Sequence, residues 1–253
     1  MLRMQRIDAI ESYVIQRRRV DLDALCEYFS VSKNTIRRDI DDLEKRGSIK
    51  KIYGGVCAAE KNELPAFKEH AETAPERKKR VAAAAASFVE NGDIIFIDSG
   101  TTTYHLAEYV SDRKNLTILT NNLNFITSGI PCENLTIISL PGTLNRRTLS
   151  FTGANTAQAL EAFNISKAFM ASTGITVERG ATNYYAAESE IKRMAMRRSR
   201  RNYLLADHTK LGVISLVTYA DLKEFDCLIT EPPLPDEFKE YMDANGKEVL
   251  LVG

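Results

Sequence analysis

Seven short apolar segments in the last two thirds of the chain constrain its fold more than any other feature. They lie at residues 93–97, 116–119, 135–140, 168–171, 203–206, 227–229 and 249–252. Helical patterns separate several of them, and this alternation is typical of an α/β fold, a mostly parallel sheet with helices on both faces. Ligands on such sheets bind at the carboxyl ends of the strands, so a site is expected in the loops after these segments.

The composition limits the classes of protein to which the chain can belong. A chain of 253 residues is long enough for two domains, and because 44% of its residues are hydrophobic it can bury a sizeable core. No apolar segment is long enough to cross a membrane, so we expect no membrane partner. Four cysteines and three histidines lie far apart, without a C-x-x-C or H-E-x-x-H motif. These observations predict a chain without metal or other cofactor, in a reducing cytoplasm.

Formal net charge is zero for the whole chain but differs along it. Residues 1–59 contain 12 Lys and Arg against 9 Asp and Glu, and residues 60–253 contain the other 22 against 25. The first segment is therefore positive by 3 and the second negative by 3. This asymmetry permits DNA binding by the first segment without proving it.

Three amphipathic helical patterns precede the apolar segments. They cover about residues 4–17, 22–29 and 32–45, and Gly47 is the expected end of the third. Short helices joined by tight turns are typical of a helix-turn-helix. Residues 48–56 then alternate apolar and polar side chains up to a Gly-Gly turn, which predicts a β-hairpin wing.

The third helical pattern is the candidate recognition helix. Aliphatic residues at i, i+4 and i+7 fix its buried face, so the basic residues of its first two turns lie on the other surfaces. Those turns meet base edges when such a helix enters a major groove, and the acids of the helix come later. The alternative is a solvated helix on which Arg37 and Arg38 pair with Asp41 and Asp42 at i, i+4.

These features coincide with a family signature. The sequence V-S-K-N-T-I-R-R-D-I-D-D-L-E-K-R-G-S-I-K-K-I-Y-G-G-V, residues 31–56, resembles the N-terminal motif of the DeoR family of bacterial transcriptional repressors. The resemblance implies a winged helix-turn-helix that binds double-stranded operator DNA, with the wing at phosphates. The DNA-binding residues it implies are Ser32, Lys33, Asn34, Thr35, Arg37, Arg38, Lys50, Lys51, Tyr53 and Gly54.

Residues 58–75 separate this region from the apolar segments. They lack periodicity and contain two prolines, so we expect a linker there. It would join a DNA-binding domain at residues 1–57 to an effector and oligomerisation domain at residues 76–253. The second domain is expected to begin with a helix at about 76–90, where an alanine run favours helix.

The loop after the first apolar segment is D-S-G-T-T-T, residues 98–103. Gly100 lets the backbone approach a ligand, and four hydroxyls stand beside a helix expected to start near Thr103. This arrangement suits a phosphate or another small anion, although the Walker A pattern is absent. A well-capped strand–helix turn without a ligand is the alternative.

Further polar residues follow later segments. Asn121 and Asn122 end one strand pattern, where Asn122 is equally expected to cap a helix. Lys210 in A-D-H-T-K can neutralise a bound phosphate, with an ordinary surface lysine as the alternative. Glu188 and Lys192 lie at i, i+4 on a helical pattern, where an intrahelical salt bridge is the alternative to a ligand contact.

Six motifs extend the resemblance over almost the whole chain. D-S-G-T-T-T, T-N-N, F-T-G, K-A-F-M, E-x-x-x-K and A-D-H-T-K-L-G occur in the order of the DeoR-family effector domain, which resembles ribose-5-phosphate isomerase. The resemblance therefore implies a phosphosugar site. The effector-binding residues it implies are Asp98, Ser99, Gly100, Thr101, Thr102, Thr103, Asn121, Gly142, Arg147, Thr173, Glu188, Lys192, Asp207 and Lys210. Thr143, Ser166 and Thr173 depart from the commoner family pattern, so the effector's identity does not follow from it.

Within the family, the segments N-I-S-K-A-F-M-A-S-T-G-I-T, V-S-K-N-T and R-G-A-T-N are together most similar to repressors of inositol-catabolism genes. We therefore expect a homodimeric or homotetrameric repressor of a sugar or polyol operon, released by a phosphorylated sugar or sugar acid. The rival interpretation is a phosphosugar isomerase with an accessory N-terminal domain. Such an enzyme needs a general base, and Ser166 and Thr173 carry hydroxyls, which leaves Glu188. A second nucleic-acid surface at the basic run 192–201 is a further alternative.

Overall fold

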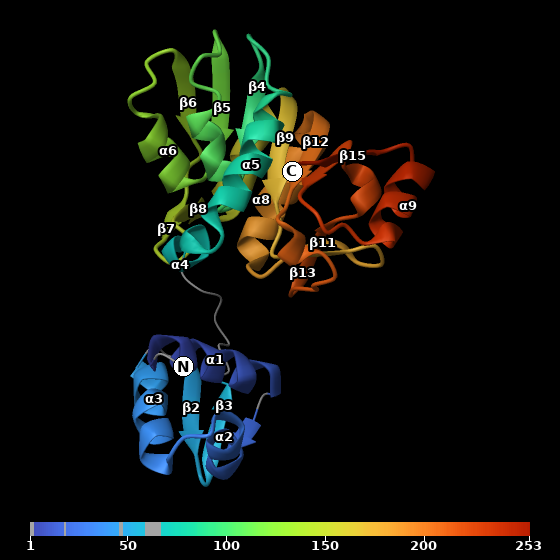
Figure 1. Cartoon of the computed structure of the whole chain (residues 1–253). Coiled ribbons are helices and arrows are strands. Elements are labelled where there is room, and N and C mark those ends of the chain that lie inside the picture. The colour runs from blue at the N-terminus through green and yellow to red at the C-terminus, as the bar shows by residue number, and fades with distance from the viewer. Residues whose placement is uncertain (1–2, 18, 46–47, 59–66) are drawn as a thin grey trace. The chain divides into compact units, whose positions relative to one another are not determined.

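The computed structural model describes residues 3–17, 19–45, 48–58 and 67–253; the expected helix end at Gly47 and part of the expected linker lie outside them. The chain divides into two compact units, residues 1–64 and 65–253 (Figure 1). Buried clusters of hydrophobic side chains form separately in the two units, so each unit is described by itself.

The N-terminal unit packs three helices on a three-stranded antiparallel sheet. The helices are α1 (Arg3–Arg17), α2 (Leu22–Phe29) and α3 (Lys33–Lys45). In sheet order, the strands are β1 (Arg19–Asp21), β3 (Gly55–Ala58) and β2 (Ile49–Ile52). The expected helix-turn-helix and hairpin wing are confirmed. Strand β1 was not predicted, because three residues are too few to show an alternating pattern.

Helix α3 is anchored by its aliphatic face. Ile36, Ile40 and Leu43 are buried in the core of the unit. Each such burial contributes about 1.5–3 kcal/mol relative to an exposed side chain. The Ser32 hydroxyl accepts a hydrogen bond from the Thr35 N–H at 3.3 Å and so caps the helix. This anchoring presents the polar surface of α3 to solvent.

The C-terminal unit is built on a seven-stranded parallel sheet. In sheet order, the strands are β15 (Glu248–Leu251), β14 (Cys227–Thr230), β12 (Ser199–Leu205), β9 (Ile165–Ala171), β4 (Ile94–Ile97), β5 (Leu116–Thr120) and β6 (Leu135–Ser139). Each strand overlaps one of the seven apolar segments, so the expected α/β fold is confirmed. Strand β4 lies between β9 and β5, which places the D-S-G-T-T-T loop near the middle of the carboxyl edge.

Side chains of the strands alternate between two cores, one on each face of the sheet. Ile95 and Ile97 of β4 join one core, and Phe96 joins the other. The first face is covered by α5 (Pro75–Ala86), the 3-10 helix η1 (Thr103–Glu108) and α6 (Leu123–Gly129) (Figure 1). The second face is covered by α7 (Ala154–Ala159), α8 (Ala186–Arg198) and α9 (Asp236–Ala244).

Several short elements were not predicted from the sequence. A second, antiparallel sheet consists of β10 (Gly174–Thr176), β11 (Gly180–Asn183) and β13 (Val217–Ala220), and a hairpin consists of β7 (Thr143–Asn145) and β8 (Ser150–Thr152). The remaining 3-10 turns are η2 (Leu160–Ala162), η3 (His208–Lys210) and η4 (Leu222–Glu224). Strands of three or four residues with polar and glycine residues give no clear pattern, so the sequence does not reveal them.

The expected linker at residues 58–75 is shorter than predicted. Phe67–Glu72 forms the helix α4. Its Phe67 ring is buried against Tyr104, with ring centroids 5.5 Å apart, and the Phe67 N–H donates to the Arg147 carbonyl at 2.8 Å. Six residues are too few to show a helical period, so the tertiary contact rather than a sequence pattern identifies this helix.

Candidate functional site

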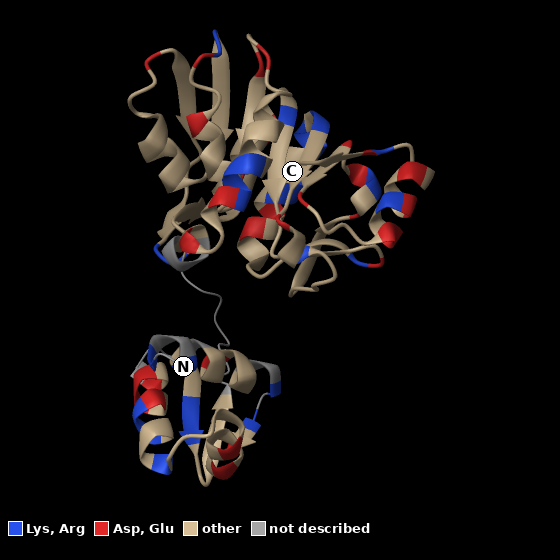
Figure 2. Ribbon diagram, in the orientation of Figure 1, with Lys and Arg blue, Asp and Glu red and all other residues tan. Residues whose placement is uncertain are grey.

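The solvent-facing surface of α3 carries Arg37 and Arg38. Neither guanidinium has a hydrogen-bond or ion-pair partner among the described residues. The acids that follow have other partners: Asp39 and Asp42 each accept a hydrogen bond from an arginine of α1 at 2.7 Å, and Asp41 lies 2.5 Å from Lys51 of the wing. The alternative in which Arg37 and Arg38 are neutralised along their own helix is therefore wrong. Figure 2 shows basic and acidic residues gathered toward opposite ends of α3.

The other residues of α3 that are predicted to contact DNA differ in their exposure and in their side-chain partners. Lys33 and Asn34 are exposed, although Lys33 lies 2.5 Å from the Asp23 carboxylate of α2. The hydroxyls of Ser32 and Thr35 lie 3.0 Å from each other at the start of the helix. Asn34 and Lys33 are thus accessible at the N-terminal end, while Ser32 and Thr35 also serve the cap.

The wing presents a mixed set of residues. Lys50 is exposed, and its side chain has no partner in the part of the chain that the structure describes. Lys51, in contrast, pairs with two acids of α3. Tyr53 is fully exposed at the tip, followed by Gly54 with φ of +79°, a conformation that favours glycine. The structure thus separates two neighbouring lysines that the sequence treats alike.

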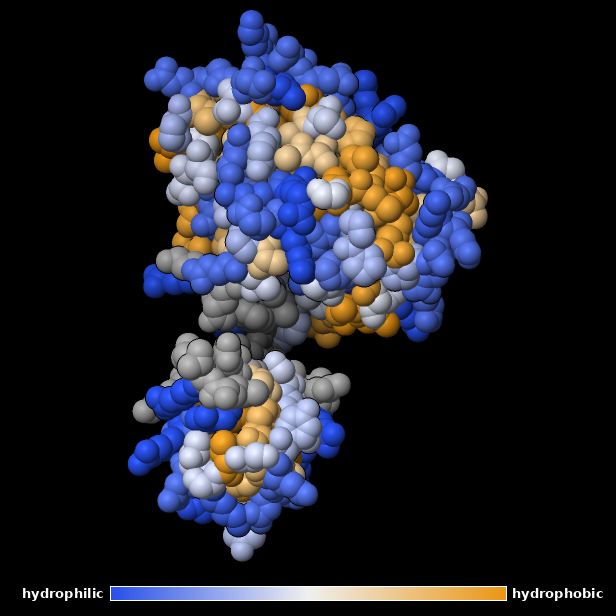
Figure 3. All heavy atoms as spheres, viewed as in Figure 1, coloured by the Kyte–Doolittle hydropathy of each residue, from blue (hydrophilic) through white to orange (hydrophobic). Residues whose placement is uncertain are grey.

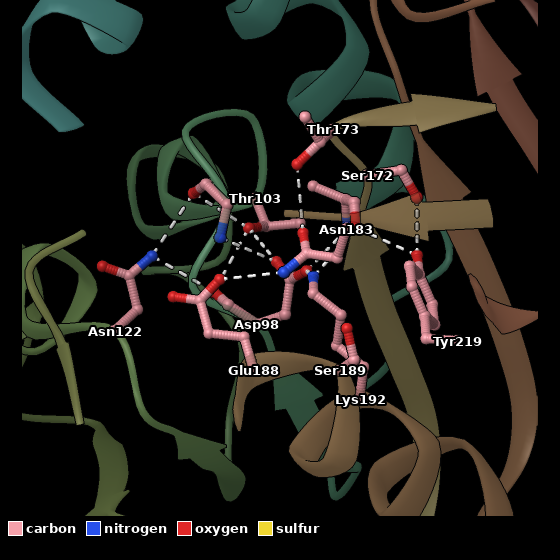
Figure 4. A network of polar contacts seen from close by, with 12 residues as sticks. Asp98, Thr103, Asn122, Ser172, Thr173, Asn183, Glu188, Ser189, Lys192 and Tyr219 are labelled. Carbon is pink, nitrogen blue, oxygen red and sulfur yellow. Dashed lines mark hydrogen bonds and ion pairs between the residues drawn. The ribbon is translucent and has the colours of Figure 1, made fainter. Parts of the chain in front are cut away.

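In the C-terminal unit, Asp98 at the end of β4 is the centre of a buried polar network (Figure 4). Its Oδ1 accepts from the Gly100 N–H at 3.0 Å and the Thr103 hydroxyl at 2.5 Å, and its Oδ2 accepts from the Ala171 N–H at 2.7 Å and from Lys192. A Cβ at Gly100 would lie 2.4 Å from the Ala171 Cβ, so only glycine fits there. Asp98 thus accepts hydrogen bonds from Thr103 and Lys192, two further residues expected at the ligand, and a ligand contact by these three residues stays a prediction.

Lys192 reaches this network from α8. Its Nζ also donates to the Ala171 carbonyl at 2.9 Å and lies 5.2 Å from the centre of the Tyr219 ring. The Tyr219 hydroxyl donates to the same carbonyl at 2.9 Å and lies 2.7 Å from the Ser172 hydroxyl. Burial raises the pKa of Tyr219 well above its ordinary value. The network therefore ties β4 and β9 to α8 and to β13 of the small sheet.

Glu188 has partners of its own. Its Oε1 accepts from the Ser150 hydroxyl at 2.8 Å and its Oε2 from the Asn183 amide at 3.1 Å. Asn183 in turn accepts from the Thr173 hydroxyl at 3.2 Å. The alternative of a Glu188–Lys192 salt bridge is wrong, because both residues use tertiary partners. Glu188 is consequently held as a structural acceptor and is not poised as a general base.

Other polar groups at the carboxyl edge remain open. The loop that contains Ser99, Thr101 and Thr102 is called here the effector loop. The hydroxyls of these three residues have no hydrogen-bond partner among the described residues. The half-buried Lys210 Nζ, within the same described ranges, also has none. Three hydroxyls and an unpaired cation at one edge suit an anionic ligand such as a phosphate.

Lys78 of α5 adds a cation that the sequence did not single out. It is 2% exposed, and burial lowers the pKa of its ammonium group to about 8, with Asp207 raising and Lys210 lowering it. Burial lowers the pKa of His105 in η1, and the charges of Lys79 and Lys78 lower it to a smaller extent, against the opposing effect of Glu108. Lys78 is therefore a buried cation whose charge interacts with Asp207 and Lys210.

The remaining predicted residues have varied surroundings. The Asn121 amide donates to the Phe151 carbonyl at 3.1 Å, while its Oδ1 is buried without a partner among the described residues. Asp207 is buried and caps its own turn. Gly142 is exposed with φ of +152°, where a Cβ would lie 2.5 Å from a threonine hydroxyl. Arg147 is half-buried and accepts the backbone hydrogen bond from α4. Of these, Asn121 offers the clearest open acceptor.

The Asn122 side chain has a structural role. Its Oδ1 accepts from the N–H groups of Asn124 and Phe125 at 3.0 and 3.2 Å and caps α6, as one alternative predicted. Its Nδ2 donates to the Asp98 and Gly100 carbonyls at 3.1 and 3.3 Å. Asn122 therefore braces the effector loop from the neighbouring strand.

Two predicted features fall at the amino edge of the sheet, opposite the effector loop. Ser166 is the second residue of β9, and its hydroxyl donates to Asp93 at 2.9 Å, far from the carboxyl edge where a general base would be needed. In the basic run, Arg198 donates to the Phe163 carbonyl at 3.0 Å and thereby anchors the end of α8. The loops at this edge are hydrophilic and form the upper rim in Figure 3.

The described residues contain no group of three or more His, Cys, Asp or Glu side chains placed to hold a metal ion. In the same part of the chain, no helix combines the length and the apolar character needed to span a bilayer.

Comparison with solved structures finds the expected likeness to ribose-5-phosphate isomerase. The isomerase A from Neisseria gonorrhoeae matches with a TM-score of 0.42 and 16% identity, over 57% of this chain and 56% of that one. An isomerase in complex with phospho-erythronic acid matches with a TM-score of 0.41 and 16% identity, over 54% of each chain.

Sequence comparisons are more decisive. The DeoR-like helix-turn-helix domain matches residues 6–62, and the DeoR C terminal sensor domain matches residues 73–232. The chain is 40% identical to the HTH-type transcriptional regulator IolR of Bacillus subtilis, over 96% of this chain and 97% of that protein. It is 30% identical to the glycerol-3-phosphate regulon repressor of Escherichia coli, over 93% of each. The chain therefore belongs to the DeoR family of helix-turn-helix transcriptional regulators, not to the isomerases.

Proposed function

We propose that this regulator represses an operon for catabolism of a polyol, with inositol the best-supported substrate, and that a phosphorylated sugar or sugar acid releases it. The similarity of three segments to repressors of inositol-catabolism genes supports the pathway, as does the 40% identity to IolR. The glycerol-3-phosphate regulon repressor, a relative at 30% identity, has a phosphorylated polyol in its name. A phosphorylated effector is in keeping with that relationship.

The DNA-binding part of the proposed function is supported mainly by the separation of charge on α3. Arg37 and Arg38 are exposed and, among the described residues, unpaired, whereas Asp39 and Asp42 are bound by α1. A free guanidinium binds O6 and N7 of guanine in the major groove through two hydrogen bonds. The N-terminal half of α3 then enters the groove, and the wing lies along the phosphate backbone.

The effector-binding part of the proposed function is supported by the polar side chains at the carboxyl edge of the sheet. The effector-loop hydroxyls would hold the phosphate, with Lys78 and Lys210 neutralising its charge. The unpartnered Oδ1 of Asn121 would accept a hydrogen bond from a sugar hydroxyl. Asp98, Asn122 and the residues bound to Asp98 keep the loop in shape and do not contact the ligand in this account.

Binding and release are linked through two states of the protein. An effector lowers DNA affinity only by binding the released state more tightly than the DNA-bound state. An operator with two-fold symmetry would favour a homodimer or homotetramer. The effector domain would supply the contacts between copies.

The isomerase alternative has less support. Aldose–ketose isomerisation needs a carboxylate or similar base near the reacting carbon. Glu188 is bound by Ser150 and Asn183, and Ser166 lies at the other edge of the sheet. Turnover of ribose 5-phosphate in a coupled assay would overturn this conclusion.

A thermal-shift screen tests the ligand class. Phosphorylated sugars and sugar acids are compared with their unphosphorylated forms at equal concentrations. A ligand at 100 times its Kd stabilises the folded state by about 2.7 kcal/mol. For a unit of this size that corresponds to a rise in Tm of about 5–10 °C. Equal shifts with the unphosphorylated forms would contradict the proposed phosphate site.

Substitution of Thr102 by valine is expected to weaken the effector response selectively. Thr102→Val removes one hydroxyl at nearly constant volume, and a hydrogen bond to a charged group contributes about 1.5–3 kcal/mol. Because about 1.4 kcal/mol corresponds to a tenfold change, we expect the affinity for the effector to fall 10- to 100-fold. The affinity for the operator in the absence of effector is expected to be unchanged. Thr127→Val, at an exposed position of α6, is the matched control. A normal effector response in Thr102→Val would place the ligand elsewhere.

Effector binding is expected to weaken as pH rises from 7 to 9. Lys78 is protonated below its pKa of about 8 and loses its charge above it, whereas a phosphate monoester is already ionised near pH 7. An affinity that depends on this charge falls by about tenfold over the interval. Isothermal titration of the wild type and Lys78→Met measures it. The variant is expected to bind more weakly at pH 7 and to show a flat profile; a flat wild-type profile would exclude Lys78 from the site.

A further inference from the structure

The two adjacent lysines of the wing differ in their surroundings. Lys51 Nζ lies 2.5 Å from Asp41 and 2.7 Å from Glu44, and the Lys51 N–H donates to Glu44 at 3.2 Å. Lys50, one residue earlier, is exposed, and its side chain is without a partner among the described residues. Both acids belong to the second half of α3. One wing lysine is therefore held by the recognition helix, and the other is free.

The strand geometry explains the difference. Successive side chains of β2 point to opposite faces of the sheet, so Lys51 shares a face with Ile49 and Lys50 does not. Ile49 is buried in the core together with the aliphatic face of α3. Lys51 is thereby directed toward α3, where Asp41 and Glu44 meet it. Lys50 is directed to the open face of the wing.

Charge balance points the same way. Hydrogen bonding to Asp41 and Glu44 raises the pKa of Lys51, and the bond from Lys51 lowers the pKa of Glu44. Moving Lys51 to a phosphate would break its ion pairs with Asp41 and Glu44, and the Coulomb attraction within those pairs opposes such a rearrangement.

We propose that Lys51 is a positioning residue that fixes the wing against α3 and makes no phosphate contact, whereas Lys50 supplies the phosphate contact of the wing. This inference rests on the proposed binding of DNA through α3. It replaces the expectation that both lysines bind phosphates. It also assigns Asp41 and Glu44 a role, since they keep one cation of the wing away from the DNA.

The salt dependence of operator binding tests the assignment. Each phosphate neutralised by a protein cation contributes about −0.9 to the slope of log K against log salt concentration. Fluorescence anisotropy with labelled operator DNA is measured between about 50 and 200 mM salt, the range in which phosphate contacts change affinity strongly. Lys50→Gln is expected to make the slope shallower by about 0.9. Lys51→Gln is expected to leave the slope unchanged even where affinity falls, and Lys51→Arg to restore the affinity.

A second experiment looks for an additional contact between the protein and a DNA phosphate, which a loss of structure cannot produce. In the double variant Asp41→Asn/Glu44→Gln, Lys51 is released, and the slope is expected to become steeper by about 0.9. A shallower slope in Lys51→Gln, an unchanged slope in Lys50→Gln, or an unchanged slope in the double variant would each overturn the proposal. Failure of the DNA-binding account itself appears differently, as wild-type affinity in Arg37→Ala.

Discussion

Replacing Lys192 with methionine is expected to lower the free energy of unfolding of the C-terminal unit by about 3–5 kcal/mol. The substitution keeps most of the side-chain length but removes the cation from Asp98, whose side chain is 1% exposed. The remaining donors, from Gly100, Thr103 and Ala171, do not neutralise the charge. A buried carboxylate left without its cation is costly, because the surroundings respond weakly to charge. Urea denaturation monitored by circular dichroism measures the change.

Two further variants separate the buried pair from a general effect of losing a lysine. Lys210→Met removes a half-buried lysine that is unpaired among the described residues and is expected to change stability by less than about 0.5 kcal/mol. The double variant Asp98→Asn/Lys192→Met leaves no unpaired charge and is expected to be more stable than Lys192→Met alone. A loss below about 1 kcal/mol in Lys192→Met would show that the pair does not hold the effector loop.

Loss of both recognition-helix arginines is expected to abolish specific operator binding. Each bidentate contact to guanine contributes about 1–3 kcal/mol of discrimination, so each substitution weakens binding about 5- to 150-fold. Arg37→Ala and Arg38→Ala combined therefore bring the affinity for the operator close to that for unrelated DNA. The fold is expected to be unaffected, because both side chains are exposed and, among the described residues, unpaired.

The matched control is Arg19→Ala, which removes an exposed arginine from β1, two strands away from the wing strand β2. Its operator affinity is expected to change less than about twofold, in line with loss of an unspecific charge. Competition with unrelated DNA distinguishes loss of specificity from general weakening. Operator binding that survives in both single variants would place the base-reading surface outside α3.

Most of the large-scale fold follows from patterns in the sequence. The seven apolar segments correspond to the seven parallel strands, and the three helical periods correspond to α1, α2 and α3, because burial on a sheet face or a helix face repeats with a fixed period. The elements that were missed have three to six residues, such as β10 and α4. Their position is determined by tertiary contacts, for example the packing of Phe67 on Tyr104.

The candidate site was predictable in its location and less so in its roles. The D-S-G-T-T-T loop lies at the carboxyl edge of β4, as its place after a buried strand implies. The sequence assigns Asp98 and Lys192 equally to the ligand, yet they bind each other across 94 positions of the chain. Lys78 was missed because nothing in E-R-K-K-R distinguishes the one lysine that the fold buries. Partner choice of this kind is a tertiary property.

A phosphorylated ligand in the C-terminal unit is expected to control operator binding by the N-terminal unit. The most direct measurement starts from the complex of the full chain with labelled operator DNA at half saturation. Fluorescence anisotropy is then followed while the best phosphorylated ligand of the thermal-shift screen, or its unphosphorylated form, is added. We expect full release of the DNA by the phosphorylated compound, no release by the unphosphorylated one, and a release curve shifted to higher ligand concentration in Thr102→Val. Binding of the phosphorylated ligand without any change in operator affinity would contradict it.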